Sequence, residues 1–482
     1  MTYRRHVVKA RVVGGAIVLL STAAALGLNG SSAAVSRPVH RAATLTAVPL
    51  LKFNPSEHFA SAPNTNQCEQ MLGYACYSPL QLETAYDMKP LYASGDTGKG
   101  ETIVIVDSFG SPTIRRDLAT FDKTYGLPNP KLTILQPAGK VPAWNPKSSA
   151  MGGWAAEASL DVEYSHAMAP GANIVLVETP VNETEGIAGL PQMMSAELAV
   201  MNPKSKYYED PSVISQSFGA TESTFATAQQ IIGLSQTYQV AQADDVTVLA
   251  STGDDGSTEP VNAAGTKYST TPAINWPASD PLVTAVGGTQ LHLNLAGQRL
   301  LPDNAWNDTN FLGSPAAGGG GRSIIFNRPT YQNGVKAVAG VHRVIPDISL
   351  SAAVDGGAVV YLSFPGSQKG YYPIGGTSEA SPLFAGVVAV TDQVLGRHIG
   401  FLNPYLYSLA AKATLKHDVG IEGITTGDNT VSFLQGGTDV TVPGWVATPG
   451  YNLVTGLGTI DGAKLVAALK TVAPVPSTTS GG

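Results

Sequence analysis

Charged residues are scarce in this sequence. Only 13% of its 482 residues are Asp, Glu, Lys or Arg, against a usage of about 25% in typical soluble proteins. The net charge is −7 and the basic residues are scattered along the chain, whereas nucleic-acid binding needs a concentrated positive surface. The composition therefore argues against nucleic acid as a partner.

Cysteine is almost absent as well. The chain has two cysteines, Cys68 and Cys76, and a metal site would need further Cys or His residues close to them. We therefore expect the two to form a disulfide that closes a small loop, which fits an oxidising compartment outside the cytoplasm.

Long apolar runs are confined to the N-terminus. Basic residues before position 12 precede an apolar run over 12–28, and the small residues 32–34 follow it. This pattern predicts a signal peptide over residues 1–34, exported by the Sec or the twin-arginine route. The alternative is a retained membrane anchor, because the run has about the minimum length for a span. With cleavage favoured, we expect a secreted monomer without stable membrane association.

The rest of the composition is that of a globular protein, because 43% of the residues are hydrophobic. Residues 35–75 show no sustained period and predict a linker or short propeptide remnant. Residues 76–472 alternate apolar strands with helical segments, which predicts one α/β domain with a mainly parallel β-sheet and helices on both faces. A disordered tail is expected at 473–482. The expected strands are 102–107, 173–177, 213–217, 246–250 and 283–286; the expected helices are 155–167, 225–243 and 382–394; the expected loops are 318–321 and 423–443.

A glycine turn followed by a serine precedes one of these helices. The segment reads Gly375-Gly376-Thr377-Ser378 and continues to Pro382, which suits the first turn of a helix and places Ser378 at the helix N-terminus. Ser378 is then either a helix cap or a nucleophile, near N–H groups that favour developing negative charge. None of the eight histidines lies in a Gly-rich motif, and Ala380 breaks the Gly-x-Ser-x-Gly pattern of α/β-hydrolases.

Two acidic sites accompany the serine. Glu157 and Asp161 are four residues apart, so on a helix both carboxylates face the same side; taken alone, such a pair is most often a solvated face. Asp254 follows an expected buried strand, at the end of a parallel sheet where functional residues gather. Its other role is ordinary Asp-Gly turn chemistry.

Taken in order, these segments resemble the sedolisin family of serine-carboxyl peptidases, which have a subtilisin-like fold. The resemblance runs from about Tyr77 to Leu469 and includes the Glu-x-x-x-Asp helix, 169–172, 251–254, 277–279 with 286–289, and 376–378 with 381–382. It implies cleavage of protein or peptide substrates, as an endopeptidase or a tripeptidyl-peptidase. The implied roles are Ser378 as nucleophile, Glu157 as general base and acid, Asp161 as its orienting carboxylate, and Asp254 in the oxyanion hole.

These roles require acid. An anionic Asp254 would repel the oxyanion, whereas a protonated one can donate a hydrogen bond to it. Carboxyl groups with reference pKa values near 4 then predict activity on the order of pH 3–5. Asp107 ends the first strand where subtilisins have their triad Asp, but its function here stays open.

The resemblance also implies a structural calcium site near the C-terminus. Its ligands would be Asp418, the carbonyls of Val419, Thr448 and Gly450, and Asn452. These oxygen donors suit Ca²⁺, although Asn452 stands where the family usually has Asp. Chelation is then expected to lower thermal stability, and an ordinary structural loop is the alternative.

Other interpretations stay open at this stage. Family members usually carry a long N-terminal pro-domain, and residues 35–75 are too few for one, so autoprocessing is undecided. A conventional serine hydrolase would use His166 or His398 as its base. A binding protein on a peptidase fold, without catalysis, is the second rival.

Overall fold

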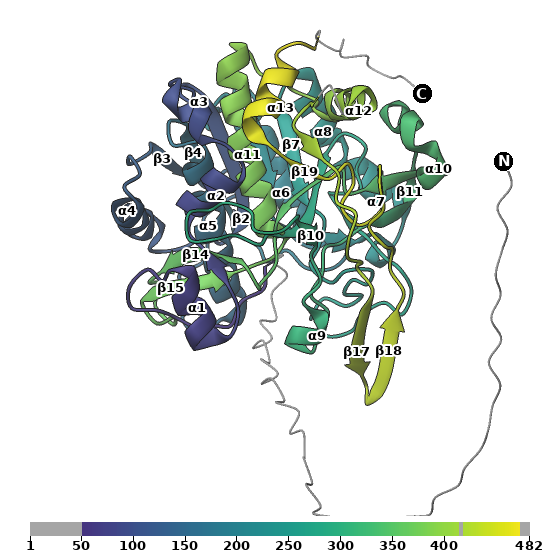
Figure 1. Cartoon of the computed structure of the whole chain (residues 1–482), viewed down its shortest axis with the longest axis horizontal. Coiled ribbons are helices and arrows are strands. Elements are labelled where there is room, and N and C mark those ends of the chain that lie inside the picture. The colour runs from purple at the N-terminus through teal and green to yellow at the C-terminus, as the bar shows by residue number, and fades with distance from the viewer. Residues whose placement is uncertain (1–50, 414–417, 473–482) are drawn as a thin grey trace, which may run out of the picture. The chain divides into compact units, whose positions relative to one another are not determined.

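The main sheet of the fold is mostly parallel (Figure 1). The computed structural model describes residues 51–413 and 418–472. Seven strands follow the order β10-β9-β7-β5-β2-β4-β3, and β13 also pairs with β9. Every pair is parallel except β10 with β9, which confirms the expected subtilisin-like sheet. The strands are β2 (Thr102–Ser108), β3 (Leu132–Leu135), β4 (Asn173–Thr179), β5 (Val213–Gln216), β7 (Thr247–Ser251), β9 (Thr284–Gln290), β10 (Asn304–Ala305) and β13 (Ile348–Ser351).

Both faces of this sheet are covered by helices. All of β2 is buried, and its side chains alternate between two clusters, because neighbouring residues of a strand point to opposite faces. Ile103 and Ile105 join the cluster that contains α5 (Ser149–Met168) and α11 (Thr377–Leu395). Val104 and Val106 join the cluster that contains α6 (Leu190–Met201) and α8 (Gln236–Ala243). The expected helices on both faces are thus confirmed.

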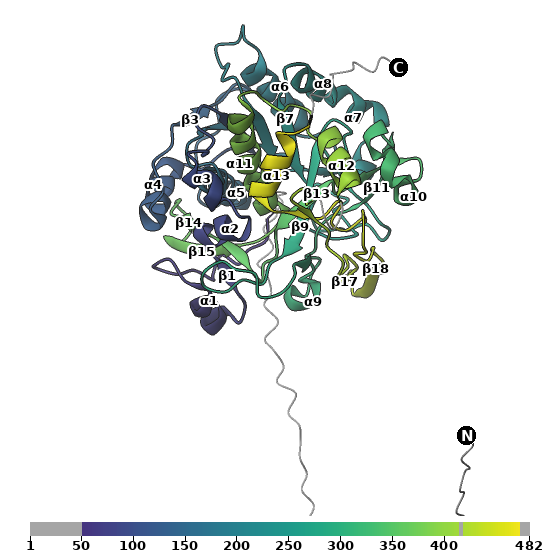
Figure 2. The same cartoon turned by 45° about the horizontal axis from the view of Figure 1, so that its top comes forward.

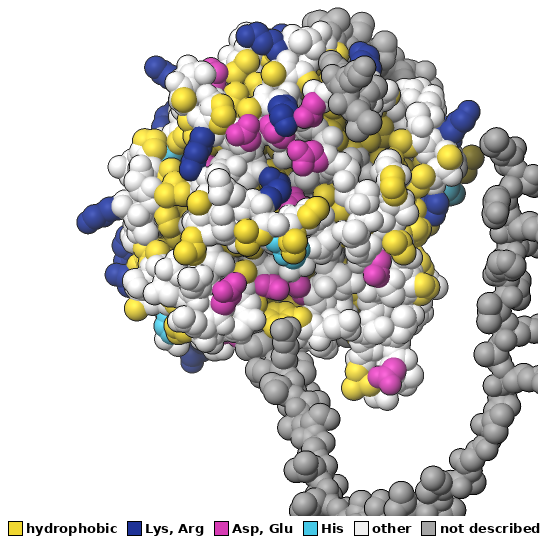
Figure 3. Space-filling view, viewed as in Figure 1, with side chains coloured by type: hydrophobic (Ala, Val, Ile, Leu, Met, Phe, Trp, Pro, Cys, Tyr) yellow, Lys and Arg dark blue, Asp and Glu magenta, His cyan; other side chains and the backbone are white. Residues whose placement is uncertain are grey.

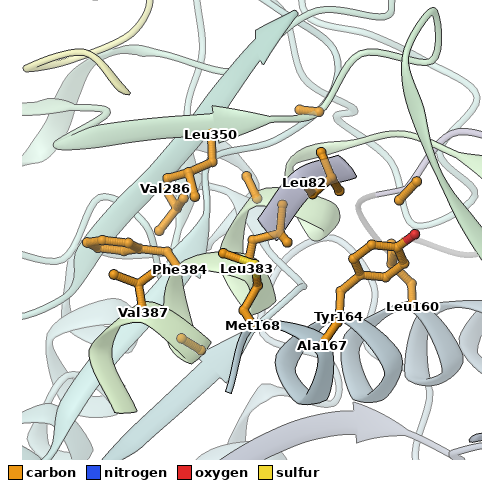
Figure 4. Close-up of a cluster of buried hydrophobic side chains, with 14 of the residues drawn as sticks. Leu82, Leu160, Tyr164, Ala167, Met168, Val286, Leu350, Leu383, Phe384 and Val387 are labelled. Atoms are coloured by element: carbon orange, nitrogen blue, oxygen red, sulfur yellow. The ribbon is translucent and has the colours of Figure 1, made fainter. Parts of the chain in front are cut away.

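Helices α5 and α11 pack against each other at the centre of the first cluster. Figure 4 shows Leu160 and Tyr164 on α5 and Leu383 and Phe384 on α11 in one buried group. In Figure 2, α13 (Gly462–Leu469) lies beside α11 in front of the sheet. Because α5 and α11 carry the expected catalytic residues, this packing fixes the site.

The remaining elements surround the sheet. The helices are α1 (Thr65–Leu72), α2 (Pro79–Ala85), α3 (Lys89–Ala93), α4 (Ile114–Tyr125), α7 (Ala228–Leu234), α9 (Thr309–Leu312), α10 (Lys336–Ala339) and α12 (Asn403–Lys412), with 3-10 turns at Glu222–Thr224 and Thr330–Val335. The strands are β1 (Cys76–Tyr77), β6 (Ala220–Thr221), β8 (Asn275–Trp276), β11 (Gly321–Asn327), β12 (His342–Ile345), β14 (Gly357–Leu362), β15 (Gly370–Ile374), β16 (Ile421–Glu422), β17 (Val431–Gln435), β18 (Thr438–Val442) and β19 (Thr459–Ile460).

Two local expectations were wrong. The helix expected over 225–243 is two helices, α7 and α8, joined at Ser235, whose hydroxyl bonds the Ile231 carbonyl and the Asp280 carboxylate. The loop expected over 423–443 contains the hairpin β17–β18, which projects from the body in Figure 1. Its strands carry alternating buried residues that a Gly- and Thr-rich composition conceals.

The segment before residue 76 also differs from the expected linker. Residues 51–75 contain α1, and Leu51, Phe53 and Phe59 are buried in the main core cluster. Cys68 and Cys76 form the expected disulfide, which joins α1 to β1. Apolar residues too sparse to show a period therefore still anchor this segment.

The signal peptide expected at 1–34 and the tail expected at 473–482 lie outside the described residues, and so does the part 35–50 of the linker or short propeptide remnant expected at 35–75. Within 51–413 and 418–472, no helix combines the length and hydrophobicity that a membrane crossing requires. On the face shown in Figure 3, the Lys and Arg side chains are scattered rather than gathered into one patch.

Candidate active site

Ser378 lies at the start of α11, where a glycine turn holds the chain against the sheet. Gly376, at φ +123°, is the N-cap residue, and its N–H donates to the Ala352 carbonyl at 2.6 Å. A Cβ on Gly375 would lie 2.7 Å from the backbone nitrogen of Val354, so this approach requires glycine. Pro382 lies inside the helix instead of in its first turn, so it cannot donate the usual N–H bond to the Ser378 carbonyl.

The Ser378 hydroxyl does not cap this helix. No side-chain cap bond forms at the start of α11. Ser378 is fully buried, and within the described residues its Oγ has no hydrogen bond of normal geometry. The structure therefore does not show the helix-cap role, and the nucleophile role of Ser378 stays a prediction.

Glu157 and Asp161 lie inside the protein and not on a solvated face. Both are on α5, and both have 0% exposure. Burial raises the pKa of Glu157 well above its ordinary value, Asp161 and Asp107 raise it further, and the neighbouring Ser378 hydroxyl lowers it. The Ser378 hydroxyl and the Glu157 carboxyl are therefore close enough to interact, which places an acid–base group beside the serine.

Asp161 is held by a residue that the sequence analysis missed. Ser217 Oγ donates to Asp161 Oδ1 at 2.9 Å. Burial raises the pKa of Asp161 well above its ordinary value, Asp107 raises it further, and the Ser217 bond lowers it. Ser217 directly follows β5. This place after a parallel strand is the one feature of the sequence that could have identified Ser217 as a residue of the site.

Asp254 joins the same site through the residue before Ser378. The Thr377 N–H and Oγ1 donate to Asp254 Oδ1 at 2.7 and 2.8 Å. Asp254 Oδ2 has no hydrogen-bond partner among the described residues. Burial raises the pKa of Asp254 to about 7, opposed by the positive charge of Lys52 and by the Thr377 bonds. A protonated Oδ2 can thus donate to a substrate while Oδ1 stays anchored.

Asp107 is a third buried carboxyl group beside the pair on α5. Asp107 is the next-to-last residue of β2 and is fully buried. Neither of its carboxyl oxygens has a hydrogen-bond partner in the described part of the chain. It raises the pKa of both Glu157 and Asp161. Three carboxyl groups therefore share one poorly solvated space, where they cannot all be ionised.

The two histidines considered as alternative bases have their polar contacts elsewhere. His166 Nε2 lies 2.6 Å from the Pro128 carbonyl oxygen, and burial lowers the pKa of His166 to about 4. His398 Nε2 lies 3.4 Å from a Glu101 oxygen. Neither supplies a hydrogen bond to Ser378 in the described structure.

Asn452, one of the five expected calcium ligands, makes contacts that do not fit the metal. Asn452 Oδ1 accepts from the N–H groups of Val454 and Thr455 at 3.0 and 2.9 Å, which fixes the amide orientation. Its Nδ2 then donates to the Thr448 carbonyl at 3.2 Å, so a hydrogen-bond donor stands where Ca²⁺ needs an oxygen. In the other half, Asp418 Oδ2 lies 2.9 Å from Lys464 Nζ.

From these contacts we propose a different effect of chelation from the one that the resemblance implies. Excess chelator is expected to leave the melting temperature of the wild type unchanged, measured by calorimetry with and without added Ca²⁺. Asn452→Asp is the matched control, because its second oxygen would face the Thr448 carbonyl and need a cation there; we expect this variant to gain stability with Ca²⁺. A wild-type melting temperature that rises with Ca²⁺ would show that the site binds the metal.

Comparisons with known proteins show which family this chain resembles. Residues 144–437 match the model of the subtilase family. Kumamolisin from Bacillus sp. (strain MN-32) is 32% identical over 82% of this chain and 63% of its own length. Sedolisin from Pseudomonas sp. (strain 101) is 30% identical over 82% of this chain and 61% of its own length. The chain thus spans less than two thirds of these curated relatives.

A solved structure covers the same part of the chain. The structure of Pseudomonas sedolisin, described as a serine-carboxyl proteinase complexed with two molecules of pseudo-iodotyrostatin, matches with a TM-score of 0.67 and 28% identity. The match covers 83% of this chain and 99% of that one.

Proposed function

This chain belongs to the subtilase family, in its sedolisin branch, and from that premise we propose that it is a serine-carboxyl peptidase that hydrolyses peptide bonds of proteins at acid pH. The observation that carries the proposal is the convergence of Ser378, Glu157 and Asp254 in one buried site. Glu157 and Ser378 lie close enough for the serine hydroxyl to lower the pKa of the Glu157 carboxyl group, and Asp254 is bound to Thr377, the residue before Ser378.

Glu157 is proposed to move the proton. In the fraction of molecules whose Glu157 is ionised, which is small in acid because its pKa is raised well above its ordinary value, Ser378 Oγ attacks the carbonyl carbon of the substrate as its proton passes to the Glu157 carboxylate. Glu157 then delivers that proton to the leaving amine. A water, deprotonated by Glu157 in turn, hydrolyses the resulting ester. Asp161, fixed by the Ser217 bond, orients Glu157.

Asp254 is proposed to stabilise the oxyanion. Thr377 donates two bonds to Oδ1, which leaves Oδ2 to carry a proton and donate it in a hydrogen bond to the tetrahedral oxygen. This requires the acid form. Because burial raises the pKa of Asp254 to about 7, that form is available throughout pH 3–5.

The pH dependence of peptide cleavage tests the proposed function. The rate is expected to be highest on the order of pH 3–5 and to fall as Asp254 ionises near pH 7. The measurement is the digestion of an unfolded protein and of an internally quenched peptide from pH 2 to 8. A maximum above about pH 7 would contradict a mechanism that needs a protonated carboxyl group.

The setting of this activity is proposed from the sequence. The apolar N-terminal run predicts export, and the Cys68–Cys76 disulfide fits an oxidising compartment. We accordingly propose a secreted monomer that acts on protein or peptide substrates. Mass spectrometry of the products distinguishes a tripeptidyl-peptidase, which releases tripeptides, from an endopeptidase, which cleaves inside the chain.

A further inference from the structure

A segment from the N-terminal part of the chain lies directly beside the proposed site. Lys52 pairs with Gly375 in an antiparallel bridge: its N–H donates to the Gly375 carbonyl at 2.7 Å, and its carbonyl accepts from the Gly375 N–H at 3.0 Å. Phe59 and Tyr371 form a second antiparallel bridge. The backbone of Lys52 is thus fixed against the turn that leads into Ser378.

The side chain of Lys52 reaches the acids of this site. Its Nζ lies 2.9 Å from Asp255 Oδ1, and the two side chains are 22% and 7% exposed. Asp255 directly follows Asp254, whose Oδ1 is bound by Thr377. A partly buried ammonium group therefore stands next to the acid proposed for the oxyanion hole.

We propose that Lys52 is a positioning residue of this active site, supplying from the N-terminal segment the positive counter-charge of the Asp254–Asp255 pair. The inference rests on the proposed function, because it gives Lys52 a part in the same reaction. Lys52 does not touch the reacting atoms; it acts through Asp254.

The other charges that face Asp254 are negative. Asp255, on the same turn, raises the pKa of Asp254, and Asp254 in turn raises the pKa of Glu157 on α5 and of Glu259. Against them, Lys52 lowers the pKa of Asp254. Without Lys52, Asp254 would hold its proton to a higher pH.

The sign of this effect is open to direct measurement. In Lys52→Met, the basic limb of the pH profile for kcat/KM is expected to move up by about one pH unit, because an opposite charge at short range shifts a carboxyl group by about that much. Lys52→Arg keeps the charge and should retain the wild-type limb. Lys123→Met, which removes an exposed lysine of α4, is the matched control and should not move it.

A second variant moves the limb in the opposite direction. Asp255→Asn removes the ion-pair partner while leaving Lys52 charged, so Asp254 should lose its proton at a lower pH. The proposal would be overturned if the basic limb of the kcat/KM profile stays at the same pH in both Lys52→Met and Asp255→Asn, even where kcat is reduced. A merely structural contact lowers the rate without shifting the pH profile. Active enzyme whose intact mass lacks residue 52 would also overturn it.

A readout without activity separates this inference from the proposed function. Because Lys52 lowers the pKa of Asp254, which burial raises to about 7, its charge favours the ionised form of that carboxyl group, so Lys52→Met should lose more thermal stability, relative to wild type, at pH 8 than at pH 5. If neither the wild type nor Lys52→Met cleaves peptides but this difference in stability is found, the proposed function is wrong and the role of Lys52 as a counter-charge is retained. If cleavage depends on Ser378 and neither the limb nor the stability responds, only the role of Lys52 fails.

Discussion

Ser378→Ala is expected to abolish peptide cleavage at every pH, by at least about 10⁴-fold in kcat, because the nucleophile of a serine peptidase has no substitute in its site. The fold should be retained. Ser378 Oγ has no hydrogen bond of normal geometry within the described residues and does not cap α11, so its removal costs no such contact. The measurement is kcat for the quenched peptide from pH 2 to 8, beside the melting temperature.

A matched serine and a double variant sharpen this test. Ser94→Ala removes an exposed hydroxyl that bonds only the Pro90 carbonyl, and it should leave kcat unchanged. Glu157→Gln should lose activity by about 10²- to 10⁴-fold as a missing general base, and the Ser378→Ala/Glu157→Gln double variant should be no slower than Ser378→Ala alone. Equal activity in wild type and Ser378→Ala would discard the nucleophile.

The sheet and its central helices could be predicted because their signal is local. Unbroken apolar runs such as 102–107 correspond to β2, buried on both faces, to which the structure adds one residue, Ser108. The starts of the central helices were harder to predict, because α5 and α11 begin six and five residues before the expected 155 and 382. The break at Ser235 could not be predicted. The Ser235 hydroxyl at this break bonds Asp280, 45 residues further along the chain, a contact that helical spacing does not reveal.

The site shows the same division. Ser378 and Asp254 could be selected because each lies next to an end of an element that the sequence marks. Glu157 and Asp161 could be selected because their spacing places both on one face of a helix. Lys52 could not, since its segment has no periodic pattern and its importance comes from pairing with Gly375, 323 residues away in the chain. Asn452 is intermediate: the sequence shows the change from the expected Asp, but only the bonds to Val454 and Thr455 show which end of the amide faces the carbonyls.

Buried carboxyl groups are spread well beyond the proposed site. In six of these groups burial raises the pKa to a value between about 6 and about 8. These are Glu83, Asp122, Glu185, Glu197, Asp308 and Glu379. An ionised carboxylate in such a position loses hydration without a cation to replace it, so the folded chain holds these groups best in their acid form.

The stability of the fold should therefore fall as the pH rises. A carboxyl group whose pKa is higher in the folded than in the unfolded chain stabilises the fold fully below its unfolded pKa, near 4, and loses that contribution as the pH rises through its folded value. For these six groups the loss spans about pH 4 to 8. His166, whose pKa is lowered to about 4 by burial, acts in the opposite direction, but it is one group against six.

We expect the melting temperature to be highest near pH 4 and to drop by on the order of 10 °C by pH 8, because each pKa unit corresponds to about 1.4 kcal/mol and several groups contribute. Calorimetry across this range measures it. Glu197→Gln is the matched variant: Glu197 is fully buried, bonds Gln216 Nε2 through Oε1, and has a pKa raised to about 8 by burial, so a neutral amide there should flatten the fall. A melting temperature that rises from pH 4 to 8 would mean that these carboxyl groups are ionised in the folded protein. The proposal that the buried carboxyl groups stabilise the fold in acid would then be wrong, and so would the acid chemistry proposed for the site.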